Sequence, residues 1–489
     1  MGRRGVTGAV AGVGVAAAVG TALADPDRRE RLRRSARVWR LTARRSAHFA
    51  AVRIRGRRKT EEERAKLEEQ FAIKTAEDVA RELGNMKGAI MKAGQMISFI
   101  AEGLPPEAQA ALATLQADVP PMAPSLAEKV IRDELGGDPE KLFLDWQPVP
   151  IAAASIGQVH KAVLPDGREV AVKVQYPGVD KAIKSDLDNA QVLYGMASQL
   201  ASLRNLDVKG IVDELRDRMG DELDYRLEAK NQDEFHQRYR GHPFFRIPAV
   251  VPERSSQRVL TSEWVDGISW AEFEATATWE TKQKAAEVLF RFAQGSINRH
   301  GIFNGDPHPG NYRFHHDGTV TFLDFGLVKR WTGGELESMA PVLDAILDCD
   351  AEGTMKAAEE GGFLARDAGL DPQKVWDYIS APYLGYIEDE FTFTREFVGQ
   401  ALGTYLDIAG PYKEVIRNLN MPPSFVILDR VVWGISALLG RLQASGRWGA
   451  VLAEYRKGAP PATELGRLEE EWRLSAVPPA QTAARAEPA

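Results

Sequence analysis

The sequence predicts an α+β fold of two lobes, in which a small β-rich N-lobe precedes a larger helical C-lobe. Three observations predict it. Residues 156–175 contain two alternating apolar segments on either side of Pro165-Asp166-Gly167, as in a β-hairpin. After Thr278 most apolar residues recur at helical spacing. This helical part is interrupted by residues 304–329, which combine a Gly-Asp-Pro turn, a short alternating strand and an Asp-Phe-Gly tripeptide.

The composition is that of a large globular chain. With 489 residues, 44% of them hydrophobic and 27% charged, it can bury a sizeable core in two or three structural units. The net charge of -7 gives no general reason to expect a nucleic-acid partner. The single cysteine, Cys349, excludes an intramolecular disulfide and suits a reducing compartment, and no Cys/His spacing resembles a zinc site.

Residues 1–59 are predicted to contact a membrane. Residues 5–24 are uncharged and nearly all Gly, Ala and Val, and their length is about that of one spanning helix. They could form a weak membrane anchor, a cleaved signal peptide or a disordered tail. The Arg-rich block at 28–59 favours retention on the cytoplasmic face, either peripherally or through a single span, and can bind an anionic leaflet. Gly8 and Gly12 would let two such helices approach closely, as in a homodimer.

Residues 60–140 predict a helical N-terminal extension. Thr60 and the three glutamates after it are typical of a capped helix start, and apolar residues recur at helical spacing from Val79 to Ile100. Lys92 and Gln95 lie three positions apart, so both can project from one face of this helix. By composition alone, such a pair is usually only exposed to solvent.

Residues 141–267 predict the N-lobe, and Lys173 is its unusual residue. Lys173 lies within Val-Ala-Val-Lys-Val, where a buried ammonium group needs a carboxylate or phosphate partner; the alternative is an edge-strand lysine that points to solvent. A later acidic helix contains Glu222, Asp224 and Glu228 and could satisfy both Lys92 and Lys173. By composition alone, this helix would present only a solvated acidic face.

The stretch at 304–329 has the spacing of a protein-kinase catalytic loop and metal-binding turn. Asp306 is followed by four residues and Asn311, and Asp324 opens the Asp-Phe-Gly tripeptide. Phosphoryl transfer depends on metals, charge neutralisation and positioning. In this interpretation Asp324 would chelate a Mg²⁺ ion that bridges the phosphates, Asn311 would hold a second Mg²⁺, and Asp306 would orient or deprotonate the acceptor.

The N-lobe supplies the other parts of such a site in the expected order. Lys173 would hold the nucleotide phosphates, and Glu228 would position Lys173. Glu263 and Val265 lie where a kinase hinge would offer backbone donors and acceptors to adenine. The helical C-lobe then follows at 268–457, and the Ala-, Pro- and Glu-rich tail at 458–489 is predicted to be disordered.

With these parts in place, residues 77–442 resemble the UbiB/AarF (ADCK-type) family of atypical protein-kinase-like proteins. The resemblance rests on motifs that set this family apart from ordinary kinases. They are the KxGQ motif at Lys92 and Gln95, the alanine-rich loop at Ala152, Ala153, Ala154 and Ser155, the ExD motif at Glu222 and Asp224 with Glu228 after it in the role of the kinase C-helix glutamate, the catalytic loop at Asp306 and Asn311, and the metal motif at Asp324.

The resemblance implies a mechanism and a setting. It implies that the KxGQ helix folds over the active site, with its lysine held by the ExD acids, and blocks protein substrates. The implied activity is ATP binding and hydrolysis, or phosphorylation of a small or lipid-like acceptor, in support of isoprenoid quinone biosynthesis or membrane lipid homeostasis. The implied cofactors are ATP or ADP and Mg²⁺, and the implied partners are membrane lipids, quinone precursors and quinone-biosynthesis proteins.

Two departures from ordinary kinases are visible. Asn304-Gly305 stands where His-Arg would precede the catalytic Asp, and Glu228 lies unusually far along the chain from Lys173, which implies inserted helices. Two other interpretations use much the same residues. One is a pseudokinase that acts as a nucleotide-switched scaffold. The other is a small-molecule kinase of the aminoglycoside-phosphotransferase type, a class that lacks a KxGQ helix.

Overall fold

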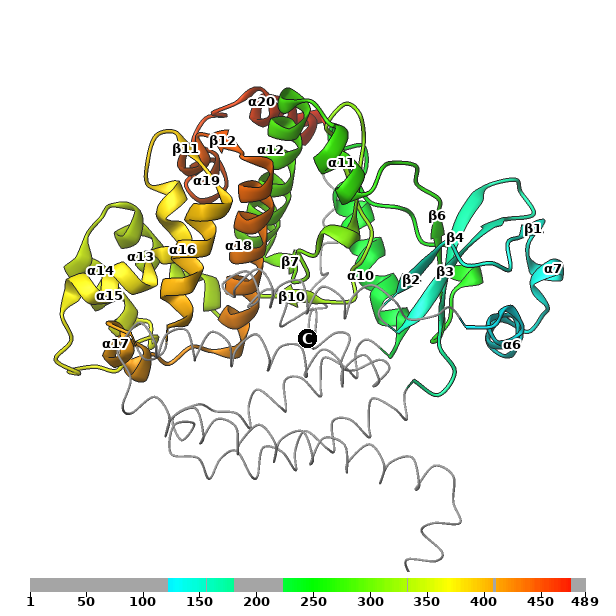
Figure 1. Cartoon of the computed structure of the whole chain (residues 1–489), viewed down its shortest axis with the longest axis horizontal. Coiled ribbons are helices and arrows are strands. Elements are labelled where there is room, and N and C mark those ends of the chain that lie inside the picture. The colour runs from blue at the N-terminus through cyan, green and yellow to red at the C-terminus, as the bar shows by residue number, and fades with distance from the viewer. Residues whose placement is uncertain (1–121, 155, 180–222, 332, 408–409, 476–489) are drawn as a thin grey trace, which may run out of the picture. The chain divides into compact units, whose positions relative to one another are not determined.

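The computed structural model describes residues 122–154, 156–179, 223–331, 333–407 and 410–475 (Figure 1). Contacts divide the chain into two compact units, one made of residues 1–120 and 178–212 and the other of residues 121–177 and 213–489. The second unit contains nearly all described residues. The predicted membrane segment 1–59 and the candidate residues Lys92, Gln95, Ser155 and Glu222 lie outside the described residues.

The N-lobe is an antiparallel sheet covered by one helix. The sheet runs in the order β1 (Asp145–Trp146), β3 (Gly157–Val163), β4 (Glu169–Gln175), β6 (Val259–Glu263), and β2 (Ala152–Ala154) also pairs with β3. The predicted hairpin is β3–β4, with Val159 opposite Lys173.

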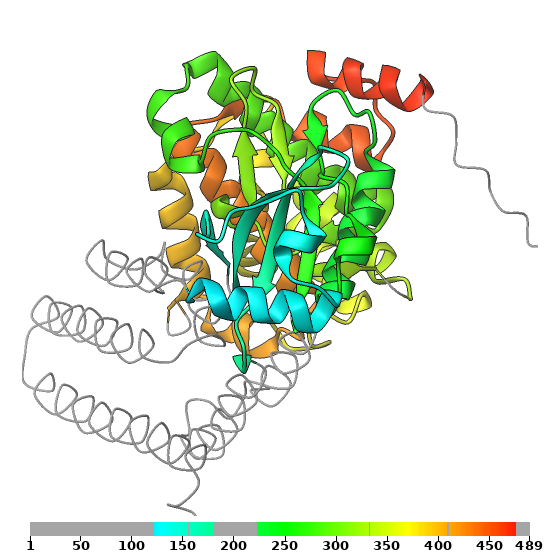
Figure 2. The ribbon, with the colours of Figure 1, turned by 90° about the vertical axis from the view of Figure 1, so that its right-hand side faces the viewer.

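Helix α6 (Pro124–Leu135) packs on this sheet, and α7 (Pro139–Leu142) follows it (Figure 2). Ala127, Val130 and Ile131 of α6 are buried in one cluster with Val172 of β4. The described N-lobe therefore includes α6 and begins before residue 141, the predicted boundary.

Two elements connect the N-lobe to the C-lobe. Helix α10 (Tyr225–Arg238) begins at Asp224, whose side chain accepts the N–H of Arg226 as an N-cap. The sequence of residues 245–270 predicts two strands, and only one of them, β6, joins the N-lobe sheet. The other, β5 (Phe245–Arg246), pairs in parallel with β9 (Val320–Phe322) of the C-lobe, and β9 pairs with β8 (Tyr312–Phe314).

The C-lobe is helical around residues 304–329. This stretch is bracketed by β7 (Ile302–Asn304) and β10 (Val328–Arg330), which pair antiparallel. The surrounding elements are α11 (Trp270–Thr276), α12 (Trp279–Gly295) with a π-helical turn at Ser296–His300, α13 (Glu335–Leu347), α14 (Ala351–Glu360), α15 (Pro372–Ile379), a 3-10 segment at Ala381–Tyr386, β11 (Phe391–Thr392), α16 (Arg395–Leu406), α17 (Lys413–Asn418), α18 (Pro423–Leu442), β12 (Ser445–Gly446), α19 (Trp448–Arg456) and α20 (Glu464–Ser475).

The helix lengths differ from the prediction. Apolar residues predict long helices at 339–364 and 375–409, but the structure interrupts each of them. The first is split after Leu347, where Cys349 adopts a positive φ of 54° and Asp350 caps α14. The final apolar segment, expected to form a packed helix pair, is instead the single 20-residue helix α18.

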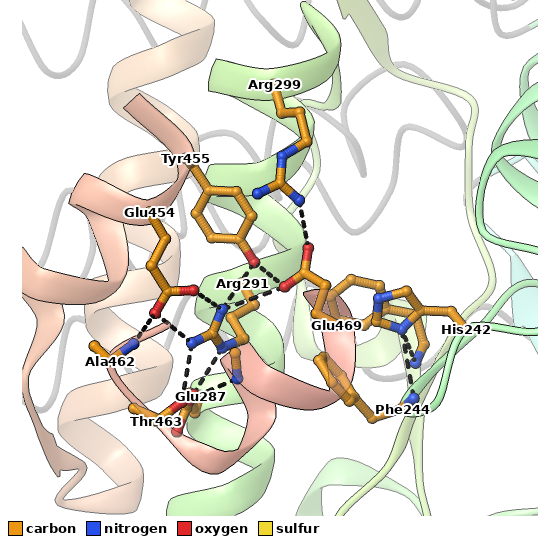
Figure 3. A network of polar contacts seen from close by, with 12 residues as sticks. His242, Phe244, Glu287, Arg291, Arg299, Glu454, Tyr455, Ala462, Thr463 and Glu469 are labelled. Carbon is orange, nitrogen blue, oxygen red and sulfur yellow. Dashed lines mark hydrogen bonds and ion pairs between the residues drawn. The ribbon is translucent and has the colours of Figure 1, made fainter. Parts of the chain in front are cut away.

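The predicted disorder of residues 458–489 is wrong for residues 458–475. Helix α20 docks on α12 and α19 through a buried polar network, because Glu469 accepts hydrogen bonds from Arg291 and Arg299 (Figure 3). The Nη2 of Arg291 also donates to Thr463 at 2.9 Å. Composition suggested too few apolar residues for packing, but one buried arginine holds this segment with charge-assisted hydrogen bonds.

In the part of the chain that the structure describes, no helix is both long enough and apolar enough to span a membrane.

Candidate active site

Lys173, Glu228 and Asp324 converge from three elements. The Nζ of Lys173, on the interior strand β4, lies 2.8 Å and 2.9 Å from the two carboxylate oxygens of Glu228 on α10. It lies 3.4 Å from Oδ2 of Asp324. β4 is flanked by β3 and β6, so Lys173 is not the solvent-facing edge lysine of the alternative interpretation.

The charge of Lys173 is secured by these neighbours. Burial lowers the pKa of the ammonium group, but the carboxylates of Asp324 and Glu228 raise it by more, so the pKa lies well above its ordinary value. Lys173 is therefore a permanent cation. Such a cation is suited to bind phosphate oxygens, and the carboxylate of Asp324 can also interact with a metal ion.

Helix α10 positions both Glu228 and the Asp-Phe-Gly turn. Asn231 donates to the carbonyl of Phe325 at 3.1 Å, and the rings of Phe235 and Phe325 lie 4.8 Å apart. Residues 228, 231 and 235 follow the i, i+3, i+7 spacing of one helix face. Sequence reasoning missed Asn231 and Phe235, although this spacing was available to find them.

The Asp-Phe-Gly turn is also fixed locally. Oδ1 of Asp324 accepts the N–H of Gly326 at 2.9 Å, and the carbonyl of Asp324 accepts a hydrogen bond from Nδ2 of Asn304 at 2.5 Å. Oδ1 of Asn304 in turn accepts the N–H of Asp306 at 2.9 Å. Asn304 thus links the catalytic loop to the metal turn, which gives a role to the residue that departs from the usual His-Arg.

Asp306 is buried, and both of its carboxylate oxygens accept hydrogen bonds. Nδ2 of Asn311 lies 3.1 Å from Oδ2, and Nη2 of Arg430 lies 2.6 Å from Oδ1. Asp306 is 4% exposed. The structure therefore brings Asp306 and Asn311 together as predicted and adds Arg430 of α18, which sequence reasoning missed.

Helix α18 packs directly against the catalytic loop. A Cβ atom at Gly305 would lie 2.8 Å from Ile427 on α18, and a Cβ at Gly434 of α18 would collide with the ring of Pro307. Glycine at both positions lets the loop and the helix approach closely enough for the Arg430–Asp306 ion pair.

Replacing Arg430 by glutamine is expected to lower kcat for ATP turnover roughly 10–100-fold with little change in KM for ATP. The substitution removes a charge-assisted hydrogen bond from the buried Asp306 without touching the residues expected to hold the nucleotide. Steady-state kinetics would measure the split between kcat and KM. Arg430→Lys should recover part of the rate. Arg441 lies on the same helix and pairs with Glu274 of α11, so Arg441→Gln should not change the rate. An equal loss in the Arg441 variant would indicate general damage to α18.

The residues present fit Mg²⁺ only when the nucleotide contributes ligands. Among the described residues, no group of three or more His, Cys, Asp and Glu side chains could hold a metal ion. Mg²⁺ commonly takes one or two protein ligands and completes its shell with phosphate oxygens and water. Asp324 offers a carboxylate. Because Nδ2 of Asn311 donates to Asp306, the amide oxygen of Asn311 is the atom left for a metal.

The hinge residues are only partly available to a nucleotide base. The sheet uses the N–H of Glu263, which donates to Ala249 at 2.8 Å, and the N–H of Trp264, which donates to Glu169 at 3.0 Å. Glu263 could therefore offer adenine only its carbonyl oxygen. The N–H of Val265 donates to none of the described residues, so it remains the candidate donor.

The alanine-rich segment, expected to be a loop, forms a strand at Ala152–Ala154. Ala152, Ala153 and Ala154 form β2 and pair with Val159, Gln158 and Gly157. Alanine is a weak strand former, so the sequence did not predict that β2 pairs with β3.

Asp224 also differs from the prediction, because its described partner is Arg226 at 2.7 Å rather than Lys173. The Arg226 hydrogen bond lowers the pKa of Asp224 more than partial burial raises it. The expected pairing of Asp224 with Lys92 lies outside the described residues.

This arrangement defines a protein-kinase-like site of the atypical class. The ABC1 atypical kinase-like domain model matches residues 114–358. The chain belongs to this family, which confirms both the expected UbiB/AarF relationship and the α+β kinase-like fold.

Named relatives agree with this assignment. ACTIVITY OF BC1 COMPLEX KINASE 1, chloroplastic, of Arabidopsis thaliana is 32% identical over 71% of this chain and 53% of its own. Atypical kinase COQ8, mitochondrial, of Saccharomyces cerevisiae is 28% identical over 75% of this chain and 73% of its own. The solved Rv3197–erythromycin complex from Mycobacterium tuberculosis is 32% identical and covers 76% of this chain and 93% of its own, with a TM-score of 0.59. The chain spans about half the length of the first curated relatives that it matches, from 43% to 53%.

Proposed function

We propose that the chain binds ATP with Mg²⁺ and transfers the γ-phosphoryl group to water or to a small or lipid-like acceptor. It would do so at the cytoplasmic face of a membrane, in support of isoprenoid quinone biosynthesis or membrane lipid homeostasis. The observation that carries the proposal is the convergence of Lys173, Glu228 and Asp324 within 3.4 Å contacts. The membership of the atypical kinase-like family supports the reaction class, and the family resemblance supports the link to quinone lipids.

Each residue has a role that follows from its contacts. Lys173 would bind the nucleotide phosphates, and Glu228 would keep its ammonium group in place. Mg²⁺ held by Asp324 and Asn311 would neutralise phosphate charge when bound. Asp306 would accept a hydrogen bond from the acceptor and orient it. Because Arg430 and Asn311 already donate to its carboxylate, Asp306 is better suited to orientation than to proton abstraction.

The occupied carboxylate of Asp306 also favours a second candidate function. If Arg430 keeps Asp306 away from any acceptor, bound nucleotide would only switch a scaffold for membrane or quinone-biosynthesis partners. Both functions need Lys173 and Asp324, but only the enzyme needs Asp306.

An ATPase assay on the full chain with vesicles separates these functions. We expect slow turnover that rises several-fold with anionic phosphatidylglycerol vesicles and with phenolic quinone precursors, because the basic block at 28–59 should bind the anionic surface. Asp306→Asn should keep nucleotide affinity and lose roughly 100-fold in rate. Neutral phosphatidylcholine vesicles are the control for the lipid effect. Equal turnover by wild type and Asp306→Asn would contradict the enzymatic function, and the nucleotide-switched scaffold would be the remaining candidate.

A further inference from the structure

A cavity of about 60 Å³ lies within the C-lobe, among α13, α14, α15, α16 and α18. None of its lining residues belongs to the candidate active site. Its walls are almost entirely aliphatic and aromatic, and they include Val342, Leu343, Phe363, Tyr378, Tyr405 and Leu428. The cavity is thus a separate apolar space with no part in the proposed phosphoryl transfer.

One ionisable acid, Asp429 of α18, interrupts this apolar lining. Its Oδ2 accepts a hydrogen bond from the hydroxyl of Tyr405 at 2.5 Å. Its other oxygen, Oδ1, accepts none from the residues that the structure describes. Burial raises the pKa of this carboxyl to about 6, although the Tyr405 hydrogen bond opposes the rise. A half-satisfied carboxyl group in an apolar cavity costs stability, and a leucine would pack there without that cost.

We propose that this cavity binds a small neutral molecule with a slim apolar body and a hydroxyl group, which donates to Oδ1 of Asp429. The same site would accept the hydroxyl-bearing end of a longer apolar molecule. The apolar walls disfavour charged ligands, because a buried charge needs more partners than the lining offers. An apolar cavity of about 150 Å³ admits benzene, so one of about 60 Å³ admits only a slimmer group.

A ligand bound in the cavity would change the position of Asp306 in the catalytic loop. Asp429 is followed on α18 by Arg430, whose guanidinium group holds Asp306 at 2.6 Å. A ligand that hydrogen-bonds to Asp429 therefore contacts the same turn of α18 from which Arg430 positions Asp306. This link rests on the proposed function, whereas the binding site itself does not.

Binding of ethanol and of dimethyl ether, which are small enough for a cavity of about 60 Å³, to the full chain tests the site. The two probes have the same number of heavy atoms, but only the alcohol can donate a hydrogen bond. Ligand-observed NMR titration should show that wild type prefers the alcohol about tenfold, as one hydrogen bond to a charged acceptor allows. Asp429→Leu should bind both probes alike. If wild type binds neither probe, or binds both equally, the proposal is wrong and the cavity is only a packing defect.

Two controls keep the result interpretable. Val342→Phe should fill the cavity and abolish binding of both probes, and it serves as the test if Asp429→Leu fails to fold. ATP turnover measured with each probe tests the link to Asp306. The alcohol should change the wild-type rate and leave the Asp429→Leu rate unchanged, and an unchanged wild-type rate at saturating alcohol would overturn the link through α18.

Discussion

Replacing Asp324 by asparagine is expected to lower kcat for ATP turnover by at least about 1000-fold. Asp324 is the carboxylate expected to bind Mg²⁺, and it also balances the charge of Lys173 across 3.4 Å. A catalytic metal contributes several kcal/mol of charge stabilisation, and each 1.36 kcal/mol corresponds to tenfold in rate. The amide oxygen of asparagine can still accept the Gly326 N–H, so the turn should keep its shape while the negative charge is lost.

Single-turnover kinetics and nucleotide titrations with and without Mg²⁺ would measure this loss. We expect the variant to bind ATP without Mg²⁺ about as well as wild type and to lose the added affinity that Mg²⁺ provides. Asp317→Asn is a matched control, because Asp317 caps the nearby β8–β9 turn through Thr319 and lies outside the candidate site. If the variant kept wild-type turnover, Asp324 would not be the metal ligand. The assignment of residues 304–329 as a kinase-like catalytic loop and metal-binding turn would then be wrong.

The parts of the site that sequence could predict are those with a strict local pattern. The pairing of Lys173 with Glu228 was predicted because a lysine inside a buried strand needs a carboxylate, and the structure confirms it at 2.8 Å. Arg430 could not be found in this way. It lies 124 residues after Asp306, and no local spacing relates the two. Only the packing of α18 against Gly305 and Pro307 brings them together.

The fold was predicted least well where tertiary contacts override composition. The alanines of β2 have little strand propensity, but pairing with β3 makes them a strand. The segment at 421–442, expected to form a helix pair, contains Gly434 and Gly440. In the structure both glycines lie inside α18, where a Cβ would collide with Pro307 or approach the backbone of Thr394. These glycines serve close packing between elements and not a turn.

Replacing Arg291 by methionine is expected to lower the free energy of unfolding by about 3–5 kcal/mol, the usual effect of breaking a buried ion pair. The Arg291 side chain is fully buried on α12, and its guanidinium group bridges Glu454 of α19 and Glu469 of α20 at 2.8 Å and 3.2 Å (Figure 3). Its Nε also donates to Glu287 at 2.7 Å. Methionine fills similar space but leaves these carboxylates without that cation. Among the described residues only Glu469 keeps a second cation, Arg299, whereas Glu454 keeps the N–H of Ala462 and Glu287 keeps the hydroxyl of Thr463.

Urea unfolding of the full chain would give the change in stability, and limited proteolysis would report whether α20 detaches first. We expect new cleavage between residues 458 and 475 at denaturant concentrations that leave wild type intact, because Arg291 holds both Glu469 and Thr463. Arg467→Met is the matched control on α20 itself. Its exposed pair with Glu464 should contribute at most about 1 kcal/mol. If both variants unfolded alike, the buried network would not be what holds the C-terminal helix, and the apolar contacts of Leu465 and Trp472 would have to carry that role.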